Sequence, residues 1–399
     1  MKYDVIIIGG GIVGLATALK ILEKNADTKL AILEKEERIA VHQSGNNSGV
    51  IHSGVYYKPG SLRAINCIRG YQMLLDFCQR YDIPYEITGK IIVATRESQL
   101  ESLQAVYEKG VANKLEGLKM IGLDEMREKE PHVNGIKAIW VPQAGIVDYR
   151  IVAEMYAELI KSAGGEIILD CKVNNIKKHS DHTEIHCSED RVFTGKKVVN
   201  CAGLYSDKLA KLTHDKALEM KILPFRGEYY KLKKEKEYLV NALIYPAPDP
   251  AFPWLGVHYT RMAKGGVEAG PNAVLAFKRE GYEFFDFKLN EFVETITYKG
   301  FLKMASKYWK IGIGEFYRSL SKSAFTKALQ ELIPEITEAD LVKGGAGVRA
   351  LACRDNGELV DDFIFYDDDR VINVCNAPSP AATSSLSIGD TVSNMVLKN

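Results

Sequence analysis

The chain has 399 residues, of which 46% are hydrophobic and 26% are charged, a composition typical of a globular protein with a large core. Lysine plus arginine and aspartate plus glutamate both total 52, which disfavours the net positive field of a non-specific nucleic-acid binder. The seven cysteines are scattered and form no CxxC pair, so we expect reduced thiols in the cytosol, no disulfide framework and no metal site.

The first 34 residues predict a dinucleotide-binding unit. Residues 3–8 are an apolar run and residues 12–23 have helical spacing, which indicates a strand, a tight turn and a helix. The turn carries a GxGxxG pattern that allows a close approach to a pyrophosphate. A second expected strand, residues 29–33, ends in an acid whose carboxylate is predicted to hold the ribose hydroxyls. The residues concerned are Gly9, Gly11, Gly14 and Glu34.

The stretch HQSGNNSGVIHSGVYYKPGS, residues 42–61, follows shortly after Glu34. A nicotinamide enzyme usually continues with regular strand–helix units, so this glycine- and serine-rich continuation favours FAD. Small residues let the chain pass close to the cofactor, and we expect donors from Ser44, Asn47, Ser48 and Gly49. His52 is predicted to face the flavin or the substrate, with His42 further back. Either histidine is alternatively an ordinary loop residue.

The middle of the chain predicts helices over residues 61–81 and 97–114 and a strand over residues 87–95. Residues 144–176 read as a helix that ends at Gly164-Gly165, followed by a strand. Residues 196–202 form an expected strand that runs into Gly203 and a helix, a second junction suited to lie beside a cofactor. Residues 221–330 alternate in short strands rich in tyrosine and phenylalanine, which favours an antiparallel sheet for a substrate.

The C-terminal stretch INVCNAPSPAATSSLSIGD predicts a strand, a turn held by Pro378 and Pro380, and a helix from about Ala381. The N-terminus of that helix would point at the pyrimidine side of the flavin and stabilise negative charge on reduction. An ordinary proline-started helix is the alternative.

Several of these stretches together carry a resemblance. The N-terminal fingerprint, residues 42–61, VVNCAGLYSD and NAPSPAATSSLSIGD resemble the FAD-dependent D-amino-acid oxidase superfamily. PFRGEYYKL, LGVHYTR, GPNAVLAFKREGY and GAGVRA are most similar to its subgroup of L-2-hydroxyglutarate oxidases and dehydrogenases. The resemblance covers nearly the whole chain and implies noncovalently bound FAD. Covalent attachment of the flavin to His42 or His52 is the alternative that the superfamily allows.

The resemblance implies a mixed α/β fold in which a Rossmann-like FAD-binding domain is interleaved with a substrate domain on an antiparallel sheet. We expect residues 1–80, 145–220 and 343–399 in the FAD-binding domain and residues 81–144 and 221–342 in the substrate domain. In this family the backbone near Val173 contacts the adenine. Further cofactor contacts are expected from Ala202, Gly203, Pro378, Ser379, Ala381, Ala382 and Thr383.

The implied reaction is oxidation of L-2-hydroxyglutarate to 2-oxoglutarate, in which a hydride leaves C2 for flavin N5 and the hydroxyl proton goes to a base. Histidine suits a neutral base near pH 7 and arginine suits a carboxylate. We predict His258 as the base, with His52 as competitor, and Arg349 for a substrate carboxylate. If LGVHYTR is a strand, His258 points away from its two pocket-candidate neighbours. The further pocket candidates are Arg226, Tyr230, Tyr259 and Arg261.

The acceptor that reoxidises the flavin is left open between quinone and oxygen. Lysines recur at helical spacing beside aromatic residues in YKGFLKMASKYWKIGIG, residues 298–314. Such a helix either packs on the substrate domain with a solvated lysine face or lies on the inner face of a membrane as a peripheral contact of a cytoplasmic protein. No secretory signal and no clean run of about eighteen apolar residues is expected.

Three alternatives to the hydroxy-acid activity remain at this stage. An amine or amino-acid oxidase would use the same scaffold, because the superfamily oxidises both C–N and C–O bonds. A flavin-dependent RNA-modifying enzyme and a protein that keeps FAD as a structural element are further alternatives. The balanced charge disfavours RNA, and the histidine and arginine motifs disfavour a silent cofactor.

Overall fold

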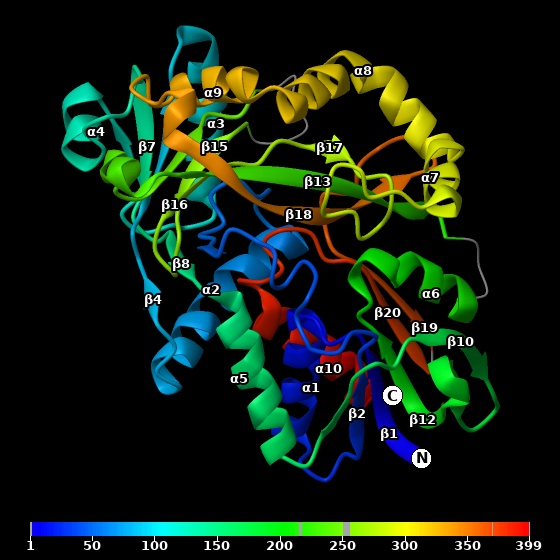
Figure 1. Ribbon diagram of the computed structural model, residues 1–399. Coiled ribbons are helices and arrows are strands. Elements are labelled where there is room, and N and C mark those ends of the chain that lie inside the picture. Colours follow the sequence, from blue (N-terminus) through cyan, green and yellow to red (C-terminus); the bar gives the residue numbers. More distant parts are fainter. Residues whose placement is uncertain (1, 215–217, 250–255, 369, 399) are drawn as a thin grey trace.

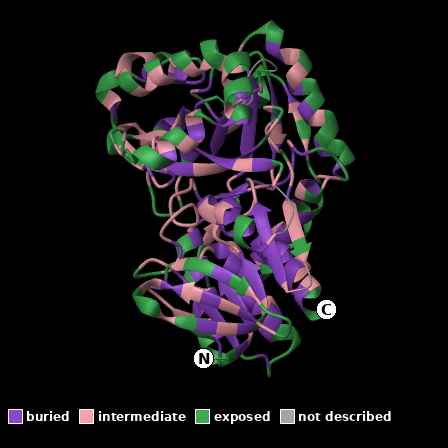
Figure 2. Ribbon diagram, turned by 90° about the vertical axis from the view of Figure 1, so that its right-hand side faces the viewer, coloured by how far each residue is buried: buried purple, intermediate pink, exposed green. Residues whose placement is uncertain are grey.

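Two large β-sheets organise the chain, one above the other in Figure 1, with helices on their outer faces. The computed structural model describes residues 2–214, 218–249, 256–368 and 370–398. Figure 2 shows that buried residues are concentrated in the central strands of both sheets, whereas the outer helices carry many exposed residues. The mixed α/β class predicted from the sequence is confirmed.

The lower sheet has eight strands and contains the N-terminal strand near its centre. Its order is β10-β11-β12-β1-β2-β9, and β20 pairs with β12 and with β19. Apolar β1 and β2 run parallel and are buried, as expected for a sheet covered on both faces. The strands are β1 (Lys2–Ile8), β2 (Leu30–Leu33), β9 (Glu166–Ile168), β10 (Val173–Lys178), β11 (Thr183–Cys187), β12 (Val192–Asn200), β19 (Ile364–Asp368) and β20 (Val371–Asn376).

Four helices pack beside this sheet. They are α1 (Ile12–Lys24), α2 (Leu62–Arg80), α5 (Tyr149–Ser162) and α10 (Ser385–Lys398). Helix α1 contacts both α5 and α10, and α10 also contacts α2. The contact is close because a Cβ on Gly389 of α10 would lie 2.6 Å from the backbone of Ala16 in α1. Helix α6 (Ser206–Thr213) follows β12 after a short turn.

The upper sheet has nine strands and is mostly antiparallel. Its order is β17-β13-β16-β15-β14-β5-β7-β6, with β18 paired to β13 and only β14 and β5 parallel. The strands are β5 (Lys90–Ala94), β6 (Lys119–Ile121), β7 (Lys137–Val141), β13 (Met220–Leu232), β14 (Leu243–Pro246), β15 (His258–Arg261), β16 (Val267–Gly270), β17 (Val274–Leu275) and β18 (Leu341–Arg354). A small third sheet joins β3 (Val50–Ile51), β8 (Gly145–Val147) and β4 (Tyr85–Glu86).

The helices around the upper sheet are α3 (Leu100–Ala112), α4 (Leu123–Lys129), α7 (Leu289–Ile296), α8 (Lys299–Leu320) and α9 (Lys322–Gln330). Helix α8 runs along the top of the molecule in Figure 1. Tyr308 departs from helical dihedral angles, so α8 bends there. Across the described residues, no helix combines the length and the apolar character that a membrane crossing requires.

Two expected boundaries differ from the observed ones. The return to the nucleotide sheet was expected at residue 343, but β18 stays paired with β13 as far as Arg354. The C-terminal helix was expected from about Ala381 and begins at Ser385. The residues before it form turns instead, in which Ala381 N–H donates to the Pro378 carbonyl and Ser384 N–H donates to the Pro380 carbonyl.

Candidate active site

A cavity of about 1290 Å³ lies where the two sheets meet. Gly9 and Glu34 from the lower sheet line it, as do Tyr245, His258 and Arg349 from the upper sheet. This volume exceeds the 300–1,000 Å³ typical of a pocket for one small ligand. The cavity therefore has room for an extended cofactor and a small substrate beside it.

The glycine turn after β1 opens into this cavity. Gly9 has φ +110°, a conformation that favours glycine, and a Cβ on Gly14 would lie 2.1 Å from the Gly9 carbonyl oxygen. Gly11 is the N-cap of α1 and offers no side-chain cap, while Ile12 N–H donates to Ser44 Oγ at 2.9 Å. Gly9 and Gly11 thus line the cavity, whereas Gly14 keeps helix and strand in close contact.

Glu34 lines the same end of the cavity and is 8% exposed. One carboxylate oxygen accepts from Gly10 N–H at 2.6 Å and the other from Glu36 N–H at 3.0 Å. Because each carboxylate oxygen has two lone pairs, both retain the capacity to accept from a ribose hydroxyl. The backbone thus orients this carboxylate beside the glycine turn.

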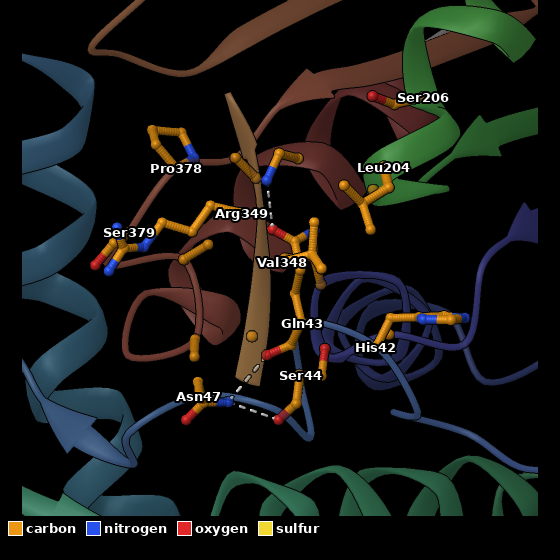
Figure 3. A pocket seen from close by; sticks show the side chains of 18 of the residues that line it. His42, Gln43, Ser44, Asn47, Leu204, Ser206, Val348, Arg349, Pro378 and Ser379 are labelled. Atoms are coloured by element: carbon orange, nitrogen blue, oxygen red, sulfur yellow. Dashed lines mark hydrogen bonds between the residues drawn. The ribbon is translucent and has the colours of Figure 1, made fainter. Parts of the chain in front are cut away.

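The loop of residues 42–50 runs along the cavity wall (Figure 3). Asn47 Nδ2 donates to the carbonyls of Gln43 and Ser44, and Gln43 Oε1 accepts from Ala350 N–H of β18 at 3.1 Å. Ser44, Asn47 and Ser48 line the cavity. Gly49 lies outside the cavity wall. It has φ +69°, and a Cβ there would lie 2.6 Å from the Val147 carbonyl oxygen.

The other predicted cofactor residues come together around this cavity. Val173, Ala202, Gly203, Pro378, Ser379, Ala381, Ala382 and Thr383 all line it. Thr383 also ties the C-terminal turn to the central loop, because its hydroxyl accepts from His52 N–H at 3.1 Å.

His258 lies at the other end of the cavity, on β15. Its Nδ1 is 2.9 Å from the Gly256 carbonyl oxygen, which can only accept, so Nδ1 carries the hydrogen and Nε2 the lone pair. The ring stacks on Tyr245, with centroids 3.8 Å apart. Burial, together with the charges of Lys90 and Arg349, lowers the pKa of His258 to about 3, so the imidazole is neutral at pH 7.

His52 lies near His258 in the cavity wall. Its Nδ1 is 3.5 Å from the Tyr57 hydroxyl and its Nε2 is 3.4 Å from Ser379 Oγ. Burial holds the pKa of His52 well below its usual range, and the charges of Lys90, Arg63 and His258 act in the same direction. Two neutral imidazoles therefore share this end of the cavity.

Two guanidinium groups line the same end. Arg349 projects from β18 on the side of Ser379 in Figure 3, and it faces the Tyr229 phenol. Arg63 donates to the Ser379 carbonyl, pairs with Asp361 and lies over the Tyr57 ring at 4.4 Å. This end of the cavity therefore brings two cations that suit carboxylates together with two neutral imidazoles that can accept a proton.

Four predicted pocket residues lie outside the cavity wall. Arg226 pairs with Glu228, and Tyr230 packs on Phe325. The Tyr259 hydroxyl donates to the Leu329 carbonyl in the core of the upper part, and Arg261 is exposed and donates to the Asn241 carbonyl. The prediction that these four contact substrate is not supported by their placement.

The alternation of side chains along a strand explains this placement. The predicted opposition of His258 and Tyr259 is present, and the cavity lies on the His258 side. On β13 the cavity likewise meets Gly227 and Tyr229, whereas Arg226 and Tyr230 point elsewhere. The stretch LGVHYTR begins at Leu255, which lies outside the described residues.

Several cavity residues were missed by sequence reasoning. Tyr229 lies directly beside the predicted Tyr230, so the sequence indicated a tyrosine at this place. Which of the two tyrosines faces the cavity depends on how the sheet is placed. Tyr245 stands in LIYPAP, which was read only as a strand. Arg63 opens a helix with no motif of its own. The missed residues that line the substrate end are Tyr56, Tyr57, Arg63, Tyr229 and Tyr245.

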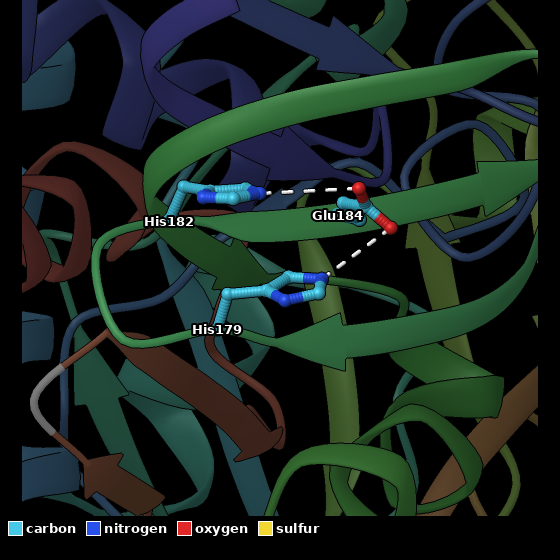
Figure 4. A group of neighbouring side chains, drawn as sticks. All are labelled: His179, His182 and Glu184. Carbon is cyan, nitrogen blue, oxygen red and sulfur yellow. Dashed lines mark ion pairs between the residues drawn. The ribbon is translucent and has the colours of Figure 1, made fainter.

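Among the described residues, two groups of histidine and carboxylate side chains have spacings that could hold a metal ion. His42 lies with Glu36 and Glu280 in the cavity wall, but Lys35 Nζ is already 2.8 Å from Glu280 Oε1 and so occupies the place of a cation. On the β10–β11 hairpin, His179 and His182 pair with Glu184 at 3.4 and 3.9 Å (Figure 4). This hairpin group is on the surface and not in the wall of the cavity.

Comparison with known proteins identifies the family. The model of the DAO family, described as FAD dependent oxidoreductase, matches residues 4–395. The chain belongs to this family. This FAD dependent oxidoreductase is 58% identical, over the full length of both chains, to L-2-hydroxyglutarate dehydrogenase of Indibacter alkaliphilus. It is 44% identical to the Escherichia coli K12 enzyme of that name, covering 97% of this chain and 91% of the relative. It is 43% identical to the human mitochondrial one, covering 99% and 89%.

Solved structures agree on the fold of this FAD dependent oxidoreductase. L-α-glycerophosphate oxidase of Mycoplasma pneumoniae, solved with FAD bound, has a TM-score of 0.81 at 23% identity, with 100% of this chain and 95% of that chain covered. Glycine oxidase of Geobacillus kaustophilus has a TM-score of 0.74 at 16% identity, with the same coverage.

The residues around the cavity fit FAD. The N-terminus of α1 offers backbone N–H groups beside glycines that leave room for a pyrophosphate. Glu34 keeps acceptor capacity for a ribose, and small residues line the path toward the histidines. These features occur in the order that an extended dinucleotide requires.

Proposed function

We propose that this FAD dependent oxidoreductase oxidises L-2-hydroxyglutarate to 2-oxoglutarate with noncovalently bound FAD. The observation that carries the proposal is a buried cavity end in which two neutral imidazoles lie beside two guanidinium groups. A 2-hydroxy dicarboxylate needs that combination of proton acceptor and cations. The relatives named L-2-hydroxyglutarate dehydrogenase support the choice of acid.

Arg349 and Arg63 are the proposed anchors of the two carboxylates. Both guanidinium groups line the substrate end, and a planar guanidinium binds both oxygens of a carboxylate. Tyr229 faces Arg349, so its phenol would orient the guanidinium. A substrate held at both ends has its C2 carbon at a defined place between the histidines and the cofactor path.

His258 is the proposed general base. Its Nε2 lone pair takes the proton of the substrate hydroxyl, while the hydride on C2 leaves and the C–O bond becomes a carbonyl. When bound, FAD supplies the acceptor of that hydride at N5. His52 is the competing base, because it lies in the same wall and is also neutral.

We propose that FAD is bound noncovalently, so that acid precipitation of the protein should release it. Both ring nitrogens of His42 are engaged, Nδ1 with the Tyr282 hydroxyl at 3.0 Å and Nε2 with Glu36 at 2.9 Å.

We also propose the lower sheet and its helices as the FAD-binding domain and the upper sheet as the substrate domain. The last boundary of the substrate domain then falls after Arg354.

A peripheral membrane contact through α8 is a second part of the proposal, with a membrane quinone as the acceptor and oxygen as the alternative. Leu302, Trp309, Ile313, Tyr317 and Leu320 recur on one side of the helix and are each 54–69% exposed. Lys299, Lys303, Lys307 and Lys310 of the same helix are also exposed. An apolar stripe bordered by cations is typical of a helix that lies on an anionic membrane surface. The protein would then act at the cytoplasmic face.

Cosedimentation with liposomes that contain anionic lipid tests this contact. The wild-type protein is expected to pellet with the vesicles at low salt, and a Trp309→Glu/Ile313→Glu variant is expected to remain in the supernatant. Phe287, 54% exposed on a loop outside α8, offers a matched control as Phe287→Glu. Equal sedimentation of wild type and the double variant would contradict a role for α8.

The activity itself is tested by anaerobic bleaching of the flavin absorbance. L-2-hydroxyglutarate should bleach the flavin rapidly, whereas D-2-hydroxyglutarate, L-lactate and sarcosine should not. Bleaching by sarcosine alone would replace the hydroxy-acid proposal with an amine oxidation. Flavin that appears in the supernatant after acid precipitation would support noncovalent binding, and flavin in the pellet would contradict it.

A further inference from the structure

Lys90 is a buried lysine that the proposed reaction does not use. It opens β5, is 1% exposed and lies outside the wall of the cavity. Its Nζ is 4.1 Å from the centroid of the Tyr245 ring and 5.5 Å from that of Tyr56. Among the described residues no ion pair joins it to a carboxylate, and Cys67 is the one group that raises its pKa. Burial lowers that pKa to about 7.

The register of three strands carries Lys90 to the active site. Lys90 pairs with Leu243 on β14, and Ile92 pairs with Tyr245. Tyr245 in turn lies beside His258 on β15 and stacks on its ring at an interplanar angle of 20°. Lys90 therefore lies two residues along β5 from the strand partner of Tyr245, close enough for its ammonium to contact that ring. Tyr245 and His258 reach the cavity, and Lys90 does not.

We propose that Lys90 is a positioning residue whose ammonium, behind Tyr245, keeps the proton-accepting imidazoles neutral and holds Tyr245 against His258. The inference rests on the proposed function, since it assumes that one of the histidines takes the substrate proton. A buried ammonium beside two imidazoles opposes a second positive charge on either ring. Stacking with the aromatic face compensates part of the cost of burying the ammonium.

Lys90 differs from the other cations near the histidines. The titratable and charged groups that face His258 are Tyr245, Lys90 and Arg349, with Tyr229 beside Arg349, and those that face His52 are Tyr57, Lys90, Arg63 and His258. Both arginines line the cavity, so the carboxylates of a bound substrate would neutralise their charges. Lys90 lies outside the wall, so a substrate carboxylate does not neutralise its ammonium at pH values below its pKa of about 7. It therefore offsets the tendency of a bound dianion to protonate the base.

The test is the pH profile of anaerobic flavin reduction by L-2-hydroxyglutarate in FAD-loaded protein. In Lys90→Met the acid limb is expected to move up by about one pH unit, because removal of a neighbouring positive charge raises the pKa of the base. At pH values below the wild-type limb the rate should fall by about tenfold, since one pH unit is a tenfold change in the deprotonated fraction. Above pH 8 the rate should match that of wild type, because Lys90 is then already neutral.

Lys90→Arg, which keeps the charge, should restore the acid limb of the wild-type pH profile. If Lys90→Met does not fold, Lys90→Gln takes its place as the neutral variant. An unmoved acid limb in a neutral variant that binds FAD would overturn the inference. The outcome is separable from the proposed function. If His258→Gln and His52→Gln both reduce the flavin at wild-type speed, the assignment of a histidine as the base is wrong. If one histidine variant is inactive but the acid limb of the neutral Lys90 variant does not move, only the proposed role of Lys90 is lost.

Discussion

The two ends of the cavity recognise their ligands in different ways. At the nucleotide end, recognition is by backbone groups of residues close in sequence, such as the glycine turn at Gly9 and the N-terminus of α1. At the proposed substrate end, it would be by side chains that come from distant strands, such as His258 on β15 and Arg349 on β18, which both line the cavity. The comparison teaches that one end depends on backbone conformation and tolerates few changes of shape. The other depends on single functional groups and tolerates changes of shape better than changes of chemistry.

The largest expected effect is at the nucleotide end. Gly14→Val should abolish FAD binding, because a Cβ there would lie 2.1 Å from a carbonyl of Gly9, which is itself in a conformation that few other residues adopt. Purified protein should show less than about a tenth of the wild-type ratio of flavin to protein absorbance, since overpacking typically costs 1–3 kcal/mol or more. Gly312→Ala in α8 is the control, because its Cβ meets no atom within 4 Å, and it should keep full FAD. Normal occupancy in Gly14→Val would contradict the close packing described here.

The next effect separates chemistry from shape. His258→Gln should lower the rate of flavin reduction by about 10²- to 10⁴-fold, the usual contribution of a general base, and leave FAD binding intact. Stopped-flow absorbance with L-2-hydroxyglutarate measures it, and His52→Gln made in parallel is the matched comparison. If the histidine at position 52 carries the larger loss, it is the base and His258 is not.

Arg349→Met should mainly weaken substrate binding. Loss of a charge-assisted hydrogen-bond pair costs about 1.5–3 kcal/mol, which predicts a KM raised by about ten- to a hundredfold. Steady-state kinetics with an artificial electron acceptor measures the change. Arg261→Met is the control, because that guanidinium is exposed and lies on the opposite face of its strand, and it should leave KM unchanged. An equal rise in both variants would mean that the loss is not specific to the cavity.

The smallest effect is expected from Tyr259→Phe. The hydroxyl donates to the Leu329 carbonyl in the core, so its removal should lower the free energy of unfolding by about 1 kcal/mol. Urea denaturation measures that loss, and kcat/KM should remain at the wild-type value. A large loss of kcat/KM with unchanged stability would return Tyr259 to the substrate site.

The nucleotide end was predictable because its motifs are local. The spacing of Gly9, Glu34 and the small residues after them was enough to place them in one cavity wall, and the turn at Pro378 is readable in the same way. The substrate end was only partly predictable. The alternation of His258 and Tyr259 followed from strand geometry, but the side that meets the cavity depends on how the upper sheet lies against the lower one.

Long-range pairing accounts for what sequence reasoning missed. Lys90 and Tyr245 become neighbours of His258 only through the register of β5, β14 and β15, which no local pattern contains. The end of β18 at Arg354 is likewise decided by its antiparallel partner β13, and not by its own residues.

The packing of α10 on α1 has a consequence for the order of synthesis. Helix α1 leaves the ribosome long before α10, which supplies its close partner around Gly389, and β20 and the turn at residues 378–383 are also made late relative to α1. During most of translation the apolar face of α1 therefore lacks its native cover, a situation that exposes a nascent chain to aggregation. FAD binding is accordingly expected as a late, post-translational event, and a nascent chain stalled before residue 370 should hold none.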